Sequence, residues 1–247
     1  MSDSNLVIYK YLPYNIAEAV VTGQHLKFSN PKSFNDPFDC DLDRLIFTLT
    51  SNNDNHTQSE LQQLEEKFGK KNLGRIGKEK LESFYKKSAE EKINKSSICC
   101  FSLTYQHPLM WSHYSDSHNG ICLAFSLKRD NSPFPLFASD KITQMAVDYP
   151  ESNISVNYLA DRFSGVKQLF FTKSIHWKYE EEFRVQIFTE PGLYAFNKDF
   201  LTEVIFGMRV SEELRERFKR LCNRSGYANL NYQKAERQKL ELQFHYE

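Results

Sequence analysis

Three separated stretches of the chain carry the residue types that could do chemistry. They are residues 35–39 (Asn-Asp-Pro-Phe-Asp), residues 110–114 (Met-Trp-Ser-His-Tyr) and residues 177–184 (Trp-Lys-Tyr-Glu-Glu-Glu-Phe-Arg). Together they offer carboxylates and a histidine for proton transfer, cations for anion binding and aromatic rings for a ligand surface. We therefore predict that the three stretches converge on one site.

The third stretch has the sharpest pattern. Side chains at positions i and i+2 of a strand share a face, so a strand here would point Glu180, Glu182 and Arg184 the same way. Neighbouring carboxylates repel each other, and one of them is expected to have a raised pKa. Trp177 adds aromatic surface, and Lys173 could add positive charge to the same opening. The structural alternative is a solvated acidic turn with a weak Glu182–Arg184 pair.

The second stretch places a tryptophan among polar side chains. Trp111, Ser112, His113 and Tyr114 precede a run of polar residues and Gly120. A histidine titrates near neutrality, so this stretch could exchange protons or bind a ligand by hydrogen bonds. Helix capping and a turn would produce a similar polar cluster, so that interpretation stays open.

The first stretch has the weakest pattern. Asn35 and Asp36 before a proline are typical of a turn, and Asp side chains often bond their own backbone. Alternatively Asn35, Asp36 and Asp39 line a pocket and contact a substrate. Asp41 and Asp43 also suggest a metal site, but at no recognised ligand spacing, and a metal-dependent nuclease would need an acidic site on Asp36, Asp39 and Glu182.

Composition excludes several classes of protein. The 32 Lys and Arg balance the 32 Asp and Glu, which argues against general nucleic-acid coating but not against a small basic pocket. No apolar run approaches the roughly 20 residues that span a bilayer. The start, Met1 to Asn5, shows no secretory pattern, and the five cysteines have no C-x-x-C spacing, so we expect an intracellular, soluble protein with reduced thiols. Serine-nucleophile, P-loop and dinucleotide-fold motifs are missing from the sequence.

The elements that must position these residues indicate an α+β fold. Apolar or alternating runs predict strands at 6–11, 26–28, 97–102, 121–125, 144–149, 182–188 and 202–206 and a closing hairpin over 229–234 and 239–246. Helices are predicted from Asn15, closed by a left-handed Gly23, from Pro108, over 156–171, and from 212 to 223 after Ser211. A Pro-rich loop with Pro133 and Pro135 follows the strand at 121–125.

Residues 51–96 differ from the rest in being rich in Glu, Lys and Leu. Gly69, Gly74 and Gly77 interrupt the helical spacing, so at least two helices are predicted. We expect one domain over residues 1–247 with 51–96 as a helical insertion.

The chain resembles a prokaryotic family known as domain of unknown function 2971. The resemblance rests on residues 9–11, 34–39, 100–102 and 110–114, and on Gly120, Lys173, Trp177, Tyr179, Glu180, Glu182 and Arg184. The name of this family gives no function.

The chain also resembles, more distantly, the NAD-dependent ADP-ribosyltransferases. Those enzymes have a basic or imidazole residue on the first strand, an aromatic or hydroxyl residue in the middle and a late glutamate. Lys10, Tyr114 (or Ser112) and Glu182 (or Glu180) follow that order, with Lys10 where Arg or His is usual. The resemblance implies a mixed, mainly antiparallel split sheet and NAD as substrate.

In that resemblance the catalytic residues are Glu182, Glu180 and Tyr114, and the NAD-binding residues are Lys10, Tyr9, Trp111, Ser112, His113, Arg184 and Trp177. It implies an enzyme that transfers ADP-ribose to a protein or nucleic acid, or hydrolyses NAD, as a toxin or antiphage effector in the cytoplasm. The alternative is a non-enzymatic ligand-binding or sensor module in a defence system, in which the same residues hold a ligand and no bond breaks.

Overall fold

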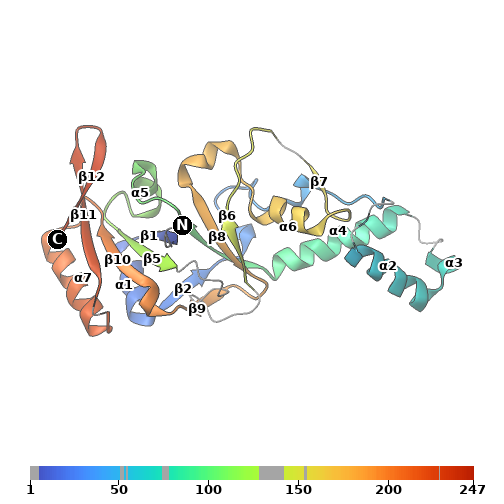
Figure 1. Ribbon diagram of the computed structural model, residues 1–247, viewed down its shortest axis with the longest axis horizontal. Coiled ribbons are helices and arrows are strands. Elements are labelled where there is room, and N and C mark those ends of the chain that lie inside the picture. Colours follow the sequence, from blue (N-terminus) through green and yellow to red (C-terminus); the bar gives the residue numbers. More distant parts are fainter. Residues whose placement is uncertain are drawn as a thin grey trace, which may run out of the picture.

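The computed structural model describes residues 6–50, 53, 55–73, 78–127, 142–152, 155–227 and 229–247. It confirms the predicted α+β class with a mixed, mainly antiparallel sheet. Figure 1 shows an elongated molecule, with the sheet and its covering helices at one end and a helical arm at the other.

An eight-stranded sheet, counted over the described residues, forms the body. Its strand order is β12-β11-β10-β5-β1-β4-β8-β6. The strands are β1 (Leu6–Leu12), β4 (Ser97–Ser102), β5 (Ile121–Leu127), β6 (Ile142–Ala146), β8 (Glu182–Ile187), β10 (Leu201–Phe206), β11 (Asn231–Gln238) and β12 (Glu241–Tyr246). Neighbouring strands run antiparallel except β10 and β11, which are parallel because helix α7 (Glu212–Arg224) crosses between them.

The sheet narrows between β1 and β4. β1 pairs with β5 along its whole length but with β4 at one position, Tyr9 opposite Ser102. The start of β4 turns instead to Ser29, which bridges to Ile98 and follows β2 (His25–Phe28). The sheet remains continuous through this junction, which lies beside the residues expected to form the site.

Two hydrophobic clusters cover the faces of the sheet. One contains Ile8 of β1 with buried side chains of α1 (Tyr14–Gly23) and α7, which contact each other. The second joins Ile98 of β4 to α6 (Arg162–Phe170) and to Tyr85 and Ile93 of helix α4 (Lys78–Asn94). A third, smaller cluster packs Trp111 of α5 (Pro108–Tyr114) on Tyr11.

The predicted helices of residues 51–96 are present as α2 (Asn55–Phe68), α3 (Lys70–Leu73) and α4. Gly69 separates the first two with a φ of 78°, a left-handed value that glycine adopts without strain. Figure 1 shows α2 and α3 at the far end of the arm, while α4 runs back to the sheet. Gly74 and Gly77 lie outside the described residues, and so does the predicted loop with Pro133 and Pro135.

Other elements are short. β3 (Leu45–Ile46) pairs with β7 (Val156–Asn157), and β2 pairs with β9 (Gly192–Ala195), a strand that the sequence did not indicate. Four 3₁₀ helices are found within the described part of the chain: η1 (Pro31–Ser33), η2 (Leu42–Arg44), η3 (Ile175–Glu180) and η4 (Lys198–Phe200).

Several predicted boundaries were wrong. Helix α1 follows Pro13 and has no side-chain cap, so Asn15 is not its cap, and the left-handed residue that ends it is Gln24 rather than Gly23. The helix predicted over 156–171 is shorter, because Val156–Asn157 pairs as a strand and the side chain of Asp161 caps α6 by accepting from the Ser164 amide. None of the helices in the described ranges is long and apolar enough to cross a membrane.

Candidate functional site

A pocket with a volume of about 170 Å³ lies beside the junction of β1 and β4. All three stretches singled out from the sequence contribute to its wall. The lining residues are Tyr9, Lys10, Tyr11, Phe34, Asn35, Asp39, Cys100, Phe101, Ser102, Met110, Tyr114, Lys173, Glu180, Glu182 and Arg184. The predicted convergence is therefore found in the structure, with aromatic rings and buried charges around one space.

The loop of the first stretch contributes through both of its ends. Asn35 lines the pocket, and Asp39 holds Arg184 with two hydrogen bonds, of 2.9 Å to Oδ1 and 2.5 Å to Oδ2. Asp36 lies outside this pocket, and its side chain accepts a hydrogen bond from the backbone amide of Phe38. The turn interpretation thus describes Asp36, while Asp39 belongs to the site.

Helix α5 presents one face of the second stretch to the pocket. Met110 and Tyr114, four residues apart, line it, as expected for one side of a helix. Trp111 is fully buried and its indole N–H donates to the Tyr105 carbonyl oxygen at 2.7 Å, so it supports the helix from behind. Ser112 and His113 are exposed and do not line the pocket. The helical period explains why Met110 and Tyr114 line the pocket while Ser112 and His113 point elsewhere.

The third stretch is not one strand, and the prediction that Glu180 shares a strand face with Glu182 was wrong. Helix η3 ends at Glu180, and Glu181 has a left-handed backbone with a φ of 41°. β8 begins only at Glu182, whose strand partner on the same face is Arg184. The turn at Glu181 leaves that residue exposed and brings the carboxylates of Glu180 and Glu182 to the same cation, Lys173.

Lys173 and Arg184 form a buried chain of charges with three acids. Lys173 Nζ lies 2.5 Å from Glu180 Oε2 and 3.3 Å from Glu182 Oε2. Arg184 Nε donates to Glu182 Oε1 at 2.8 Å, and the same guanidinium binds Asp39. Arg184 has no exposed surface and also donates to the Phe170 carbonyl oxygen at 2.8 Å. Its guanidinium therefore positions Asp39 and Glu182. The predicted contact between Arg184 and NAD stays a prediction.

The pKa values of the two pocket glutamates are shifted in opposite directions. Burial would raise the pKa of Glu182, but the charges of Arg184 and Lys173 outweigh it and lower that pKa to about 2. For Glu180, burial dominates and raises the pKa, although Lys173 and the Tyr114 hydroxyl act in the opposite direction. Environments that separate the pKa values of two neighbouring carboxyls are typical of sites that use them for different tasks.

Glu180 is held at both oxygens. The Tyr114 hydroxyl donates to Oε1 at 2.5 Å, while Lys173 binds Oε2. Burial, followed by the hydrogen bond to Glu180, raises the pKa of Tyr114, so this hydroxyl remains a proton donor at neutral pH. The Ser102 hydroxyl fixes the backbone by donating to the Glu180 carbonyl oxygen at 2.6 Å. The carboxylate of Glu180 is consequently oriented before any ligand arrives.

Lys10 brings a different kind of charge to the pocket. Its Nζ donates to the Cys100 carbonyl oxygen at 2.6 Å and lies 5.6 Å from the centre of the Phe101 ring. Within the described residues, no carboxylate lies in salt-bridge distance of Lys10, in contrast to Lys173 and Arg184. Lys10 can therefore offer its charge to an anionic or carbonyl group of a ligand.

Two further predicted residues lie at the rim. Trp177 is half-buried and its ring stacks under Lys173, with Nζ 4.7 Å from the ring centre, so it acts on the pocket through that lysine. Tyr9 lines the pocket and packs on Tyr105, and burial raises its pKa to about 12.

Five lining residues were given no role in the site by the sequence analysis: Tyr11, Phe34, Cys100, Phe101 and Ser102. All five lie in the segments 9–11, 34–39 and 100–102 on which the family resemblance rests, and that shared membership could have identified them.

Comparison with known proteins gives one match. Residues 110–185, less than a third of the chain, match the family model described as "Protein of unknown function (DUF2971)". This segment runs from α5 into β8 and so contains two of the three predicted stretches. Neither a curated protein nor a solved structure matches the chain. These comparisons give no support to the resemblance to ADP-ribosyltransferases, which stays a prediction.

Proposed function

We propose that the pocket is the active site of an enzyme that breaks the bond between nicotinamide and ribose in NAD. The observation that carries the proposal is the oriented carboxylate of Glu180, held by Tyr114 and Lys173 at the wall of a pocket rich in aromatic rings. Sites that bind a whole small molecule usually have roughly 300–1,000 Å³. The smaller volume of about 170 Å³ suits one ring of the substrate, with the remainder outside.

The chemistry assigns a separate task to each charged group. As the glycosidic bond breaks, its electron pair leaves with the nicotinamide nitrogen, and the ribose carbon gains oxocarbenium character that the Glu180 carboxylate can stabilise. The acceptor, water or a nucleophile on a protein or nucleic acid, then bonds to that carbon and gives up its proton to the carboxylate or to solvent. Lys10 faces an anionic or carbonyl group of the substrate, and Glu182 with Arg184 keeps Lys173 in place.

This assignment makes Glu180 the catalytic glutamate, whereas the sequence pattern favoured Glu182. Glu182 is bound by two cations and has a pKa of about 2. Glu180 is bound by one cation and a neutral hydroxyl. The less neutralised carboxylate is the better partner for a developing positive charge, so Glu180 is proposed as the catalytic residue. Consumption of NAD would fit an effector that acts as a toxin or in antiphage defence.

Nicotinamide release from NAD by the purified protein tests the proposal. Glu180→Gln should lower the rate by at least about 10²-fold, the typical effect of losing a group that stabilises transition-state charge. Glu181→Gln is the matched control, because it makes the same chemical change one residue away at an exposed side chain. Glu180→Gln should also lower stability, because Lys173 loses a buried partner, so urea unfolding of both variants identifies conditions in which each is folded and the rates are compared there. Absence of release in every acceptor mixture, or equal rates in the two variants, would reject the proposal.

The fully engaged Arg184 favours a second candidate function. All its hydrogen bonds are made within the protein, as in a rigid binding module that holds a ligand without breaking a bond. In that case the Glu180→Gln variant would change the affinity for NAD measured by calorimetry, and no nicotinamide would appear with either protein.

A further inference from the structure

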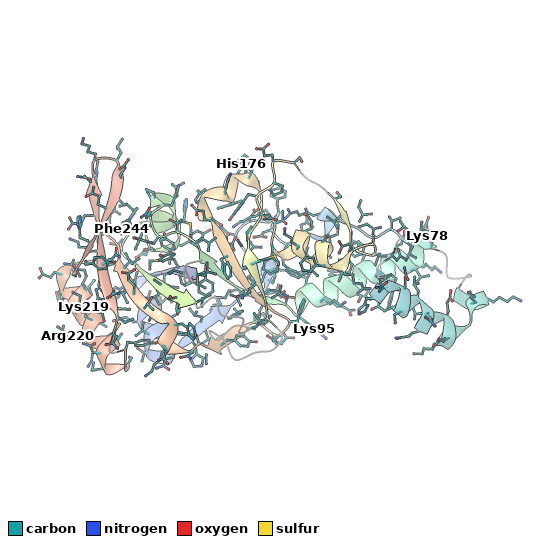
Figure 2. The ribbon with its side chains drawn as sticks, in the orientation of Figure 1. Lys78, Lys95, His176, Lys219, Arg220 and Phe244 are labelled. Atoms are coloured by element: carbon teal, nitrogen blue, oxygen red, sulfur yellow. The ribbon has the colours of Figure 1, made fainter. Side chains whose placement is uncertain are left out.

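A second hollow lies away from the pocket, between helices α4 and α6. This α4–α6 groove has a volume of about 600 Å³, within the roughly 300–1,000 Å³ range of small-molecule sites. Its lining residues include Glu91 and Lys92 of α4, Arg162 of α6, and Lys95 and Phe188. Lys95 follows the end of α4 that lies nearest to the sheet, opposite the end marked by Lys78 (Figure 2). The groove shares no lining residue with the pocket.

The floor of the groove is apolar and aromatic. Ala89, Tyr158, Leu169 and Phe170 line it and are buried. Phe188, just after β8, also lines the groove and is 43% exposed. A flat ring could stack on Phe188, since nucleobases stack on aromatic side chains without regard to their identity.

The walls of the groove are positively charged. Lys92, on α4, and Lys95, just after its end, have no salt bridge to a carboxylate in the part of the chain that the structure describes, and both residues are exposed. Arg162, on α6, is held by Glu60 at 2.7 Å and donates two hydrogen bonds to the Thr57 hydroxyl, so its charge is engaged within the protein. Burial, and then Arg162, lowers the pKa of Lys92, while Glu60 acts in the opposite direction. Glu91 also lines the groove, and the cations left for an anionic ligand are Lys92 and Lys95.

We propose that the α4–α6 groove binds a phosphate-bearing nucleotide, with its base on Phe188 and its phosphate against Lys92 and Lys95. The nucleotide can be free or one unit of a single-stranded nucleic acid, because both offer the same base and phosphate. The proposal is independent of NAD cleavage, since none of the groove residues takes part in the proposed reaction.

Fluorescence anisotropy with a labelled single-stranded decanucleotide, and calorimetry with AMP and with inorganic phosphate, test this site in the full-length protein. The variant Lys92→Ala/Lys95→Ala should weaken nucleotide binding about tenfold, or about 1.4 kcal/mol. The matched control is Lys86→Ala/Lys87→Ala, which removes two exposed lysines from the same helix outside the groove. Phe188→Ala should weaken binding as well, whereas Phe84→Ala, an exposed phenylalanine on α4, should not.

The outcomes distinguish a free nucleotide from a single-stranded nucleic acid, and binding in the α4–α6 groove from binding in the pocket. Tighter binding of the decanucleotide that falls steeply with salt supports the groove as a nucleic-acid site, while AMP binding of equal strength supports a free nucleotide. A Lys10→Met variant should bind both probes as the wild type does, which excludes the pocket as their site. The proposal is overturned if neither probe binds at millimolar concentration, if both lysine pairs have equal effects, or if phosphate alone binds as tightly as AMP.

Discussion

In the pocket, Lys173 and Arg184 are buried and each contacts two carboxylates, whereas in the α4–α6 groove Lys92 and Lys95 are exposed and lack a carboxylate partner among the described residues. The two regions thus use positive charge differently. The pocket's cations neutralise the protein's own acids and fix their geometry. Removing any one partner would leave a buried charge uncompensated, which destabilises the fold. The groove's two lysines have no such partner in the described part of the chain and are available to a ligand. The comparison predicts large stability effects in the first region and small ones in the second.

The largest effect is expected at Arg184. Arg184→Met would leave Asp39 and Glu182 buried without their shared cation, and loss of one member of a buried ion pair typically costs about 3–5 kcal/mol. Urea unfolding followed by circular dichroism measures this loss. Arg217→Met is the control, because its pair with Glu18 is on the surface, with 59% of the Arg217 side chain exposed, and should cost below about 1 kcal/mol. Equal losses of unfolding free energy in the two variants would show that the buried ion pairs of Arg184 stabilise the fold no more than the surface pair of Arg217.

A smaller effect with a defined pH dependence is expected at Glu182. Its pKa falls from 4.5 to about 2 on folding, so the ionised form stabilises the folded protein above about pH 4.5, and this stabilisation is lost as the pH falls toward 2. At roughly 1.4 kcal/mol for each pH unit, the contribution is on the order of 3 kcal/mol. Glu182→Gln should therefore destabilise the protein at pH 7, and its deficit relative to wild type should shrink between pH 4.5 and pH 2. Urea unfolding at a series of pH values checks this, and a deficit that does not change with pH would contradict it.

The smallest effect is expected in the groove. Lys92→Met removes an exposed ammonium that has no carboxylate partner within the described part of the chain, so the free energy of unfolding should change by less than about 0.5 kcal/mol. The measurement is again urea unfolding, at low and at high salt. A loss comparable to that of Arg184→Met would show that Lys92 is part of the structure's own charge balance.

Local patterns predicted much of the fold. β4 and β8 were predicted nearly to the residue, because an apolar run in one and alternation in the other are encoded by adjacent side chains. Helix α7 was predicted with its cap, since the Ser211 side chain accepts a hydrogen bond from the Leu214 amide. The closing hairpin is present as β11 and β12, but β11 continues to Gln238, four residues beyond the predicted end of that strand, so the turn falls at residues 239–240.

The sequence identified the residues of the site better than it predicted their contacts and backbone conformations. The bond between Asp39 and Arg184 joins residues 145 positions apart, and no local pattern indicates such a partner. The left-handed backbone of Glu181 is unusual for a residue with a side chain, so alternation across residues 180–184 suggested a strand that does not form. Trp111 looked like a pocket residue because its neighbours are polar, but the phase of α5 turns it into the core.

The junction of β1 and β4 also bears on how the protein folds. Its contacts are distant in sequence: the Tyr11 hydroxyl donates to the Thr104 carbonyl oxygen at 3.0 Å, a separation of 93 residues. Closing so long a loop is entropically costly, and contacts of this range slow the folding of a sheet, whereas helices α2 to α4 depend on local contacts and can form early. β8 is synthesised later still and must dock on β4 to supply Glu182 and Arg184. The pocket should therefore be completed in the last kinetic phase of folding, so ligand binding would serve as a reporter of the fully folded chain.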